Sequence, residues 1–295
     1  MNWEICLKSY YNYILIERNL SKNSVEAYMR DLQQFAKFNK KVKPSKIKRE
    51  HILNYINEIN DSNINPRSQA RILSSIKSLY NFLIFDNQIK EDPCKHIKSP
   101  KIGSKIPEIL TVQEIDLIIA SIDLSKENGE RNRAIIECLY SCGLRVSELI
   151  SLQISNIEYD DNIIKVMGKG NKQRITPLSK TLKKYLKNYI QYIRSKQKPN
   201  KENMDIVFLN RRNKKISRVM IFNIIKQQAN LAGIKKNVSP HTLRHSFATH
   251  LVEGGADLRV VQEMLGHANI TTTEIYTHLN NQYLREEIIN YHPRS

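Results

Sequence analysis

Apolar residues recur every three or four positions through the first 90 residues, which is the spacing of amphipathic α-helices. Ser21 or Asn23 can cap the second of these helices. We expect helices at about residues 3–19, 23–38, 48–60 and 66–85. Because helices with short connections form a small bundle, residues 1–90 are predicted to be an N-terminal helical domain.

The next segment interrupts this pattern. Residues 91–107 contain Pro93, Pro100, Gly103 and Pro107 among several lysines. Proline and glycine oppose a continuous helix, so we interpret this segment as a basic linker between two domains.

The pattern after the linker is mixed. Ile163, Ile164 and Val166 precede a Gly-Lys-Gly-Asn turn at 168–171, and Ile175 follows it, which indicates a β-hairpin. Helices are expected at about residues 111–122, 130–142, from 147, 179–197, 217–231, 240–252, 258–265, 271–279 and 282–290. The predicted fold class is mainly α, with a small β-hairpin or sheet in a C-terminal domain at residues 108–295.

Composition narrows the class of protein. The chain has 295 residues, 40% hydrophobic and 26% charged, which is typical of a globular protein of one or two domains. It lacks a signal-peptide pattern and the roughly 18 uninterrupted apolar residues of a membrane span. Four cysteines are too few for a disulfide scaffold and fit a reducing compartment. We therefore expect a cytoplasmic protein.

Charge indicates the partner. The formal net charge is +18, and the parts before and after Pro100 carry +7 and +11. Because lysine and arginine release counterions when they neutralise phosphates, a polyanion is the natural ligand. A lysine-rich but merely soluble surface is the alternative.

A phosphate-binding arrangement follows Ser239, which with Pro240 forms a strong helix start. His241 and Arg244 are then three residues apart on one face of the first turns. A helix N-terminus attracts anions, and a guanidinium can bind an oxyanion with two hydrogen bonds. A capped surface helix with an incidental histidine and arginine is the alternative.

Further candidates lie downstream of this helix. Gly266 is expected to end a helix, which places His267 on a loop. Thr271 and Glu274 form a capping box for a short helix that carries Tyr276. Taken alone, Tyr276 could equally be a buried aromatic residue.

Three segments, SCGLRVSEL, HTLRHSFATH and LGHANITTTEIYTH, together resemble the tyrosine recombinase family, and the resemblance extends to the helical N-terminal part, the linker and the GKGNKQR hairpin. The family signature of Arg, Lys, His-x-x-Arg, His and a nucleophilic Tyr falls here on Arg145, Lys169, His241, Arg244, His267 and Tyr276. The resemblance implies a two-domain, C-shaped DNA clamp with a core-binding (SAM-like) N-terminal domain and the tyrosine recombinase catalytic fold.

The resemblance also implies a mechanism. Arg145 and Arg244 would clamp the scissile phosphate, and Tyr276 would attack phosphorus to give a 3′-phosphotyrosyl intermediate. A phenol with a pKa near 10 needs a base, for which His241 is the candidate.

Two residues complete the implied site. Lys169 would protonate the departing 5′-oxygen, and His267 would orient the phosphate or the tyrosine. Such chemistry needs no metal, ATP or other cofactor.

Within the family the chain resembles the cellular Xer branch. This implies double-stranded DNA, a XerC-like recombinase in a heterotetramer, a dif-type site for the resolution of chromosome dimers, and an FtsK-type translocase as partners. Membranes and small-molecule substrates are not expected.

Other functions and sites remain open at this stage. The functional alternatives are an integrase of a mobile element, a catalytically silent DNA-binding protein, a type IB topoisomerase and a metal-dependent nuclease. His241 and His245 are four residues apart, but no zinc-binding set accompanies them, so His245 is expected to be structural. Cys138 and Cys142 are expected in the core. Base-reading side chains are expected on helices near 21–38, 66–85 and 217–231.

Overall fold

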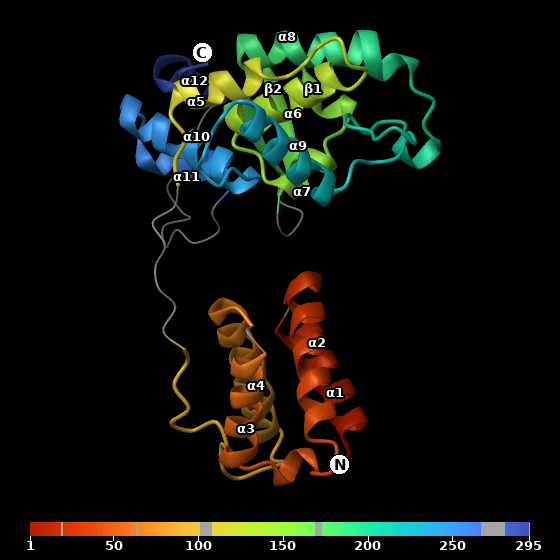
Figure 1. Cartoon of the computed structure of the whole chain (residues 1–295), viewed down its shortest axis with the longest axis vertical. Helices are drawn as coiled ribbons and strands as arrows, with labels where there is room; N and C mark the ends of the chain where they lie inside the picture. Colours follow the sequence, from red (N-terminus) through yellow and green to blue (C-terminus); the bar gives the residue numbers. More distant parts are fainter. Residues whose placement is uncertain (19, 63, 101–107, 169–172, 267–280, 295) are drawn as a thin grey trace. The chain divides into compact units, whose positions relative to one another are not determined.

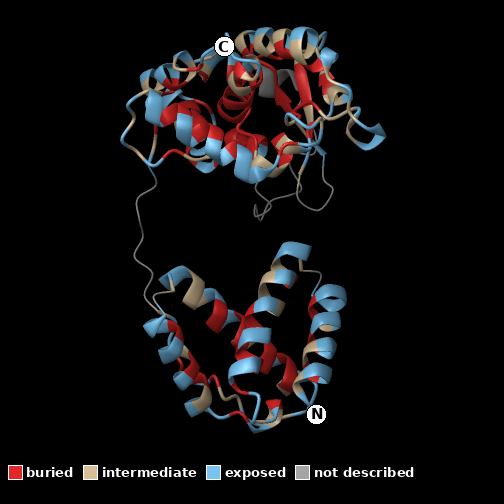
Figure 2. Cartoon of the chain, turned by 45° about the vertical axis from the view of Figure 1, so that its right-hand side comes forward, coloured by how far each residue is buried: buried red, intermediate tan, exposed pale blue. Residues whose placement is uncertain are grey.

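The computed structural model describes residues 1–294 except 19, 63, 101–107, 169–172 and 267–280, and only the backbone of residues 281–285 (Figure 1). The chain divides into two compact units, Met1–Lys105 and Ile106–Ser295. Buried residues, red in Figure 2, gather in the interior of each unit. Within the described residues, every helix is too short or too polar to cross a membrane.

Unit 1 is a bundle of four α-helices, as the periodicity predicts. The helices are α1 (Trp3–Asn12), which continues as a π-helical turn (Tyr13–Glu17), α2 (Lys22–Phe38), α3 (Arg49–Asp61) and α4 (Pro66–Phe85). Ser21 caps α2 by accepting a hydrogen bond from the Ser24 N–H at 3.3 Å. The core gathers the apolar faces of all four helices, and a buried Asp31 pairs with Arg71 between α2 and α4.

Unit 2 is mainly helical and contains one small sheet. Its α-helices are α5 (Val112–Ala120), α6 (Gly129–Ser141), α7 (Val146–Ile150), α8 (Lys180–Asn188), α9 (Arg218–Leu231), α10 (Pro240–Gly254), α11 (Leu258–Leu265) and α12 (Asn281–Tyr291). Its strands are β1 (Ile157–Glu158), β2 (Ile163–Met167) and β3 (Gln173–Pro177).

The sheet is antiparallel in the order β1-β2-β3. The predicted hairpin is β2 and β3, in which Val166 pairs with Arg174 and Lys165 with Ile175. The sequence pattern missed β1, which is only two residues long.

One expected helix changes its type along its length, and another lies where no comparison can be made. The helix predicted at 179–197 is helical from Lys180 to Lys196, but after Asn188 it changes from α-geometry to a π-helical turn (Tyr189–Ile193) and then to a 3₁₀ turn (Arg194–Lys196). Tyr189 is buried there and donates a hydrogen bond to the Val207 carbonyl at 3.0 Å. The helix expected at 271–279 lies outside the described residues.

Helix α6 is the central element of unit 2. It contacts α5, α7, α8, α9 and α10 (Figure 1), and almost all of its residues are buried. Its end is followed by Gly143, which has a positive φ of 54°. A Cβ there would lie 2.5 Å from the ring of Phe247 on α10, so only glycine fits. This close approach packs the turn between α6 and α7 against α10.

Candidate active site

Helix α10 begins as the sequence predicts. The Ser239 hydroxyl accepts a hydrogen bond from the Thr242 N–H at 3.2 Å, and Pro240 occupies the first helical position. His241 is exposed on the first turn, whereas Arg244 is buried one turn further on. The helix start thus presents an imidazole to solvent and directs a guanidinium inward.

The Arg244 guanidinium joins two loops. Its Nη1 donates to the carbonyl of Gly143, and its Nη2 donates to the carbonyl of Leu265. Burial, together with the charges of Arg145 and Arg174, lowers the pKa of Arg244 to about 10. Arg244 therefore stays charged at neutral pH, with little water to compete for its donors.

Arg145 approaches the same place from the start of α7. Its backbone N–H donates to Glu148 Oε2 at 2.7 Å, which caps the helix, and its Nη1 donates to Glu148 Oε1 at 2.9 Å. Its Nη2 donates to the Gly266 carbonyl at 2.9 Å. The carboxylate three residues downstream thus orients the predicted catalytic arginine.

Glu148 also binds a third arginine, which the sequence analysis did not identify. Arg174 on β3 donates from Nη2 to Glu148 Oε2 at 2.9 Å, and Arg244 Nη1 lies 3.9 Å from the same oxygen. Glu148 is only 3% exposed. The available signal was spacing: Glu148 stands at the capping position after Arg145, and Arg174 ends the GKGNKQR segment.

This cluster has a strong excess of positive charge. Among the described residues, three guanidiniums surround the single carboxylate of Glu148. A partly desolvated cationic cluster stabilises an anion far better than exposed arginines do. Its fork-shaped donors match the oxygens of a phosphate.

The structure therefore brings Arg145 and Arg244 together and places His241 at the start of the same helix as Arg244. Lys169, His267 and Tyr276 lie outside the described residues. Gly266 ends α11 in the left-handed conformation, with a φ of 63°, as the sequence predicts.

The expectation for His245 is wrong, because its side chain is exposed. The buried histidine of α10 is His250, which is hydrogen-bonded to the Tyr140 hydroxyl at 2.8 Å. Cys138 and Cys142 lie in the core, as predicted. In the part of the chain that the structure describes, no group of three or more His, Cys, Asp or Glu side chains could hold a metal ion.

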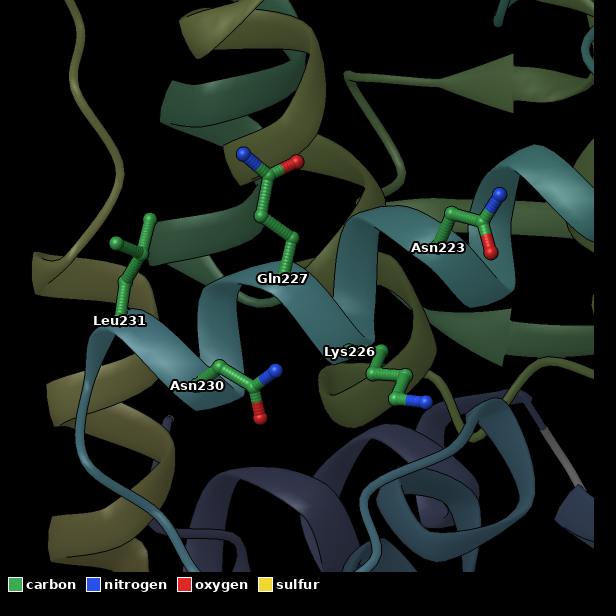
Figure 3. Close-up of a pocket in the computed structure, with 5 residues that line it drawn as sticks. All are labelled: Asn223, Lys226, Gln227, Asn230 and Leu231. Carbon is green, nitrogen blue, oxygen red and sulfur yellow. The ribbon is translucent and has the colours of Figure 1, made fainter.

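A separate surface hollow lies along α9 and is lined by Asn223, Lys226, Gln227, Asn230 and Leu231 (Figure 3). Its lining is mostly amide and contains one charged side chain. The cluster around Glu148 contains three arginines and a carboxylate. Because guanidiniums bind phosphate oxygens well, this cluster is the better candidate for chemistry on a phosphate.

Two family models match the chain. The model described as the phage integrase family matches residues 108–283, and that of the phage integrase N-terminal SAM-like domain matches residues 7–87. A curated relative, tyrosine recombinase XerD of Staphylococcus haemolyticus (strain JCSC1435), is 40% identical over 295 residues, which covers 99% of this chain and 100% of the relative.

Solved structures of other recombinases are also similar to this chain. A crystal structure of XerA recombinase is 31% identical and covers 100% of both chains, with a TM-score of 0.52. A XerH site-specific recombinase bound to difH substrate in a pre-cleavage complex is 25% identical, covers 91% of this chain and 80% of that one, and has a TM-score of 0.68.

Proposed function

The chain belongs to the phage integrase family as a Xer-type tyrosine recombinase, and from this premise we propose that it resolves chromosome dimers at a dif-type site together with a XerC-like partner. Site-specific recombination by strand cleavage and religation is the activity of this class of enzyme.

One observation carries the assignment of residues: Arg145 and Arg244, which are 99 residues apart in the sequence, share the carboxylate of Glu148 in a partly desolvated cluster. We assign both to the scissile phosphate. Their guanidiniums bind the non-bridging oxygens and stabilise the negative charge that develops there in the transition state.

The covalent step is assigned to Tyr276. Its phenolic oxygen forms a bond to phosphorus while the bond from phosphorus to the 5′-oxygen breaks, and the electron pair of that bond remains on the 5′-oxygen. His241 accepts the phenolic proton, Lys169 donates a proton to the departing oxygen, and His267 orients the phosphate. Religation is the reverse reaction, and the phosphotyrosyl bond keeps the energy that it needs.

The partners follow from the Xer type. Double-stranded DNA is the substrate, and the similarity to XerD supports pairing with a XerC-like recombinase in a heterotetramer. A solved Xer recombinase bound to a difH substrate supports a dif-type site. The proposal includes activation by an FtsK-type translocase in the cytoplasm, during chromosome partition at cell division.

The decisive experiment traps the covalent intermediate. A nicked duplex with a dif-type site is incubated with the unmodified protein or with Tyr276→Phe in the presence of EDTA, and a denaturing gel separates protein–DNA adducts. We expect an adduct with the unmodified protein alone, because the variant lacks the nucleophilic oxygen. An adduct of equal yield with Tyr276→Phe would refute the assignment of Tyr276.

The same substrate tests the partner. If the unmodified protein binds the site without forming an adduct, a XerC-like recombinase is added. Adduct formation only in its presence supports the heterotetramer. Tight binding without an adduct in either case would instead favour a catalytically silent DNA-binding protein.

A further inference from the structure

The C-terminal end of α11 binds all three arginines of the cluster. Each of three successive carbonyl oxygens there accepts a hydrogen bond from a different guanidinium. The pairs are Met264 with Arg174 at 2.8 Å, Leu265 with Arg244, and Gly266 with Arg145 at 2.9 Å. The last carbonyls of a helix lack partners within it, so these arginines satisfy the helix end.

Arg174 is the arginine of this set that the proposed chemistry does not use. It is 11% exposed, and it bridges two structures: Nε donates to the Met264 carbonyl, and Nη2 donates to Glu148 Oε2 at 2.9 Å. It lies on β3, where its backbone pairs with Val166. A rigid strand thus supplies the guanidinium that connects Glu148 to the end of α11.

We propose that Arg174 is a positioning residue for strand cleavage, acting through Glu148 and the end of α11. This inference rests on the proposed function of Arg145 and Arg244. Glu148 Oε2 accepts from Arg174 Nη2 and from the Arg145 backbone N–H, while Oε1 accepts from Arg145 Nη1. The carboxylate is thus held with Oε1 toward the Arg145 guanidinium. The fixed orientation of the carboxylate in turn orients the guanidinium of Arg145.

The packing around Gly266 supports a second effect of Arg174. A Cβ at this position would lie 3.2 Å from Cδ of Arg174 and 3.5 Å from Nη1 of Arg145. The two arginines therefore pack directly against the residue at which the chain leaves α11. The next residue in the sequence is His267, and Tyr276 follows nine residues later. Arg174 therefore helps to hold the end of α11, whose last carbonyl binds the Arg145 guanidinium.

Arginine geometry, and not charge alone, is required for this role. Nε and Nη2 lie on one edge of the planar guanidinium and bond two acceptors at once, whereas a lysine ammonium is a single point charge. We therefore expect Arg174→Lys and Arg174→Gln both to slow adduct formation on the nicked dif-type duplex, by about 10- to 100-fold. DNA affinity should stay within about twofold, because many other cationic groups bind the backbone.

The matched control is Arg133→Gln. Arg133 on α6 is 15% exposed and donates to Glu130 at 2.6 Å, so it resembles Arg174 in burial and in having a carboxylate partner. It belongs to neither the Glu148 cluster nor the end of α11. We expect Arg133→Gln to cleave at the rate of the unmodified protein, even if its thermal unfolding midpoint falls as far as that of Arg174→Gln.

A change of substrate tests whether Arg174 positions Arg145 or only stabilises the folded protein. A methylphosphonate at the scissile position carries no negative charge on its non-bridging atoms, so cleavage depends less on a well-placed Arg145. If Arg174 positions Arg145, the defect of Arg174→Gln should shrink to less than about threefold on this substrate. A general loss of structure would slow cleavage of both substrates equally.

The outcomes distinguish this inference from the proposed function. Adduct formation by the unmodified protein, with the loss in both Arg174 variants and the rescue by methylphosphonate, supports the inference. An adduct that Arg174→Gln forms at the normal rate, or an equal defect on both substrates, overturns the inference alone. No adduct from the unmodified protein, with its XerC-like partner present, overturns the proposed function and the inference with it.

Discussion

His292 is the most strongly perturbed histidine among the described residues. It directly follows α12, with its ring centroid 4.9 Å from that of Tyr140 and 5.3 Å from that of Phe247. Burial, assisted by the nearby His250 and Arg294, lowers the pKa of His292 to about 3. The folded protein therefore keeps this imidazole neutral.

This predicts a loss of stability in mild acid. Between about pH 6.5 and pH 3 the unfolded chain binds a proton at His292 that the folded chain does not bind. The free energy of unfolding must therefore decrease as the pH is lowered. The contribution from this residue is up to about 1.4 kcal/mol per pH unit. Urea unfolding of the unmodified protein and of His292→Gln at pH 7, 6 and 5 should show a shallower pH dependence for the variant.

Two comparisons make this test specific. His245→Gln, at an exposed position of the same unit, is the control for replacing a histidine by glutamine. Buried Glu137 has a raised pKa, so it acts in the opposite sense, but it is present in both proteins and cancels in the difference. An equal pH dependence for His292→Gln and the unmodified protein would contradict the prediction.

Sequence reasoning found Arg244 from its place after a helix start and Arg145 from the family signature, and it missed the two residues that bond to them, Glu148 and Arg174. The structure places Arg145 and Arg244 beside Glu148. Glu148 and Arg174 were missed because a carboxylate in a capping position and an arginine in a strand are ordinary in isolation. Only the fold brings Arg174 to a carboxylate 26 residues away.

Two glycines, Gly266 at the end of α11 and Gly233 after α9, allow the effect of a left-handed backbone to be separated from the effect of neighbouring side chains. Gly266 and Gly233 both have positive φ, 63° and 71°, in the left-handed region. A Cβ at Gly233 would meet nothing within 4 Å, whereas a Cβ at Gly266 would contact Arg174 and Arg145. The two positions therefore share one backbone requirement and differ in their neighbours.

We expect Gly266→Ala and Gly233→Ala each to lower the free energy of unfolding by about 1–2 kcal/mol, the cost of a left-handed alanine. Only Gly266→Ala should also slow adduct formation, because it displaces the arginine side chains. Thermal unfolding and the nicked-duplex assay measure the two effects separately. A comparable slowing in Gly233→Ala would attribute the effect to backbone strain alone.

Helix ends were predicted well where a single local residue determines them. The starts of α2 and α10 follow from Ser21 and Ser239, and the end of α11 follows from Gly266. The change of helix type after Asn188 was not predicted, and the feature that accompanies it is packing: Tyr189 stacks on Phe208 at a centroid distance of 5.5 Å while keeping the helical spacing from Leu182 and Leu186. Such tertiary packing leaves no mark in the periodicity.

At the scale of the whole molecule, the net charge predicts how DNA binding should depend on salt. The formal net charge is +18, and the parts before and after Pro100 are both basic. Each phosphate that is neutralised releases counterions, so binding should weaken steeply as salt increases.

We predict that log K for a dif-type duplex falls by about 0.9 per contacted phosphate for each log unit of salt. Titrations between 50 and 200 mM salt should show a loss of about 10³- to 10⁵-fold if six to ten phosphates are contacted. Nearly constant affinity over this range would contradict backbone binding by both basic parts of the chain.

The three carbonyls at the end of α11 have a stereochemical consequence. Arg145 and Arg244 each give one donor to this helix end, so a ligand can reach them only by their remaining edges. The two non-bridging oxygens of a DNA phosphodiester are diastereotopic, because the sugars on either side are chiral, and a binding site with fixed donors contacts each of them differently. The enzyme would therefore distinguish the two diastereomers of a backbone in which sulfur replaces one of these oxygens, although both carry the same charge.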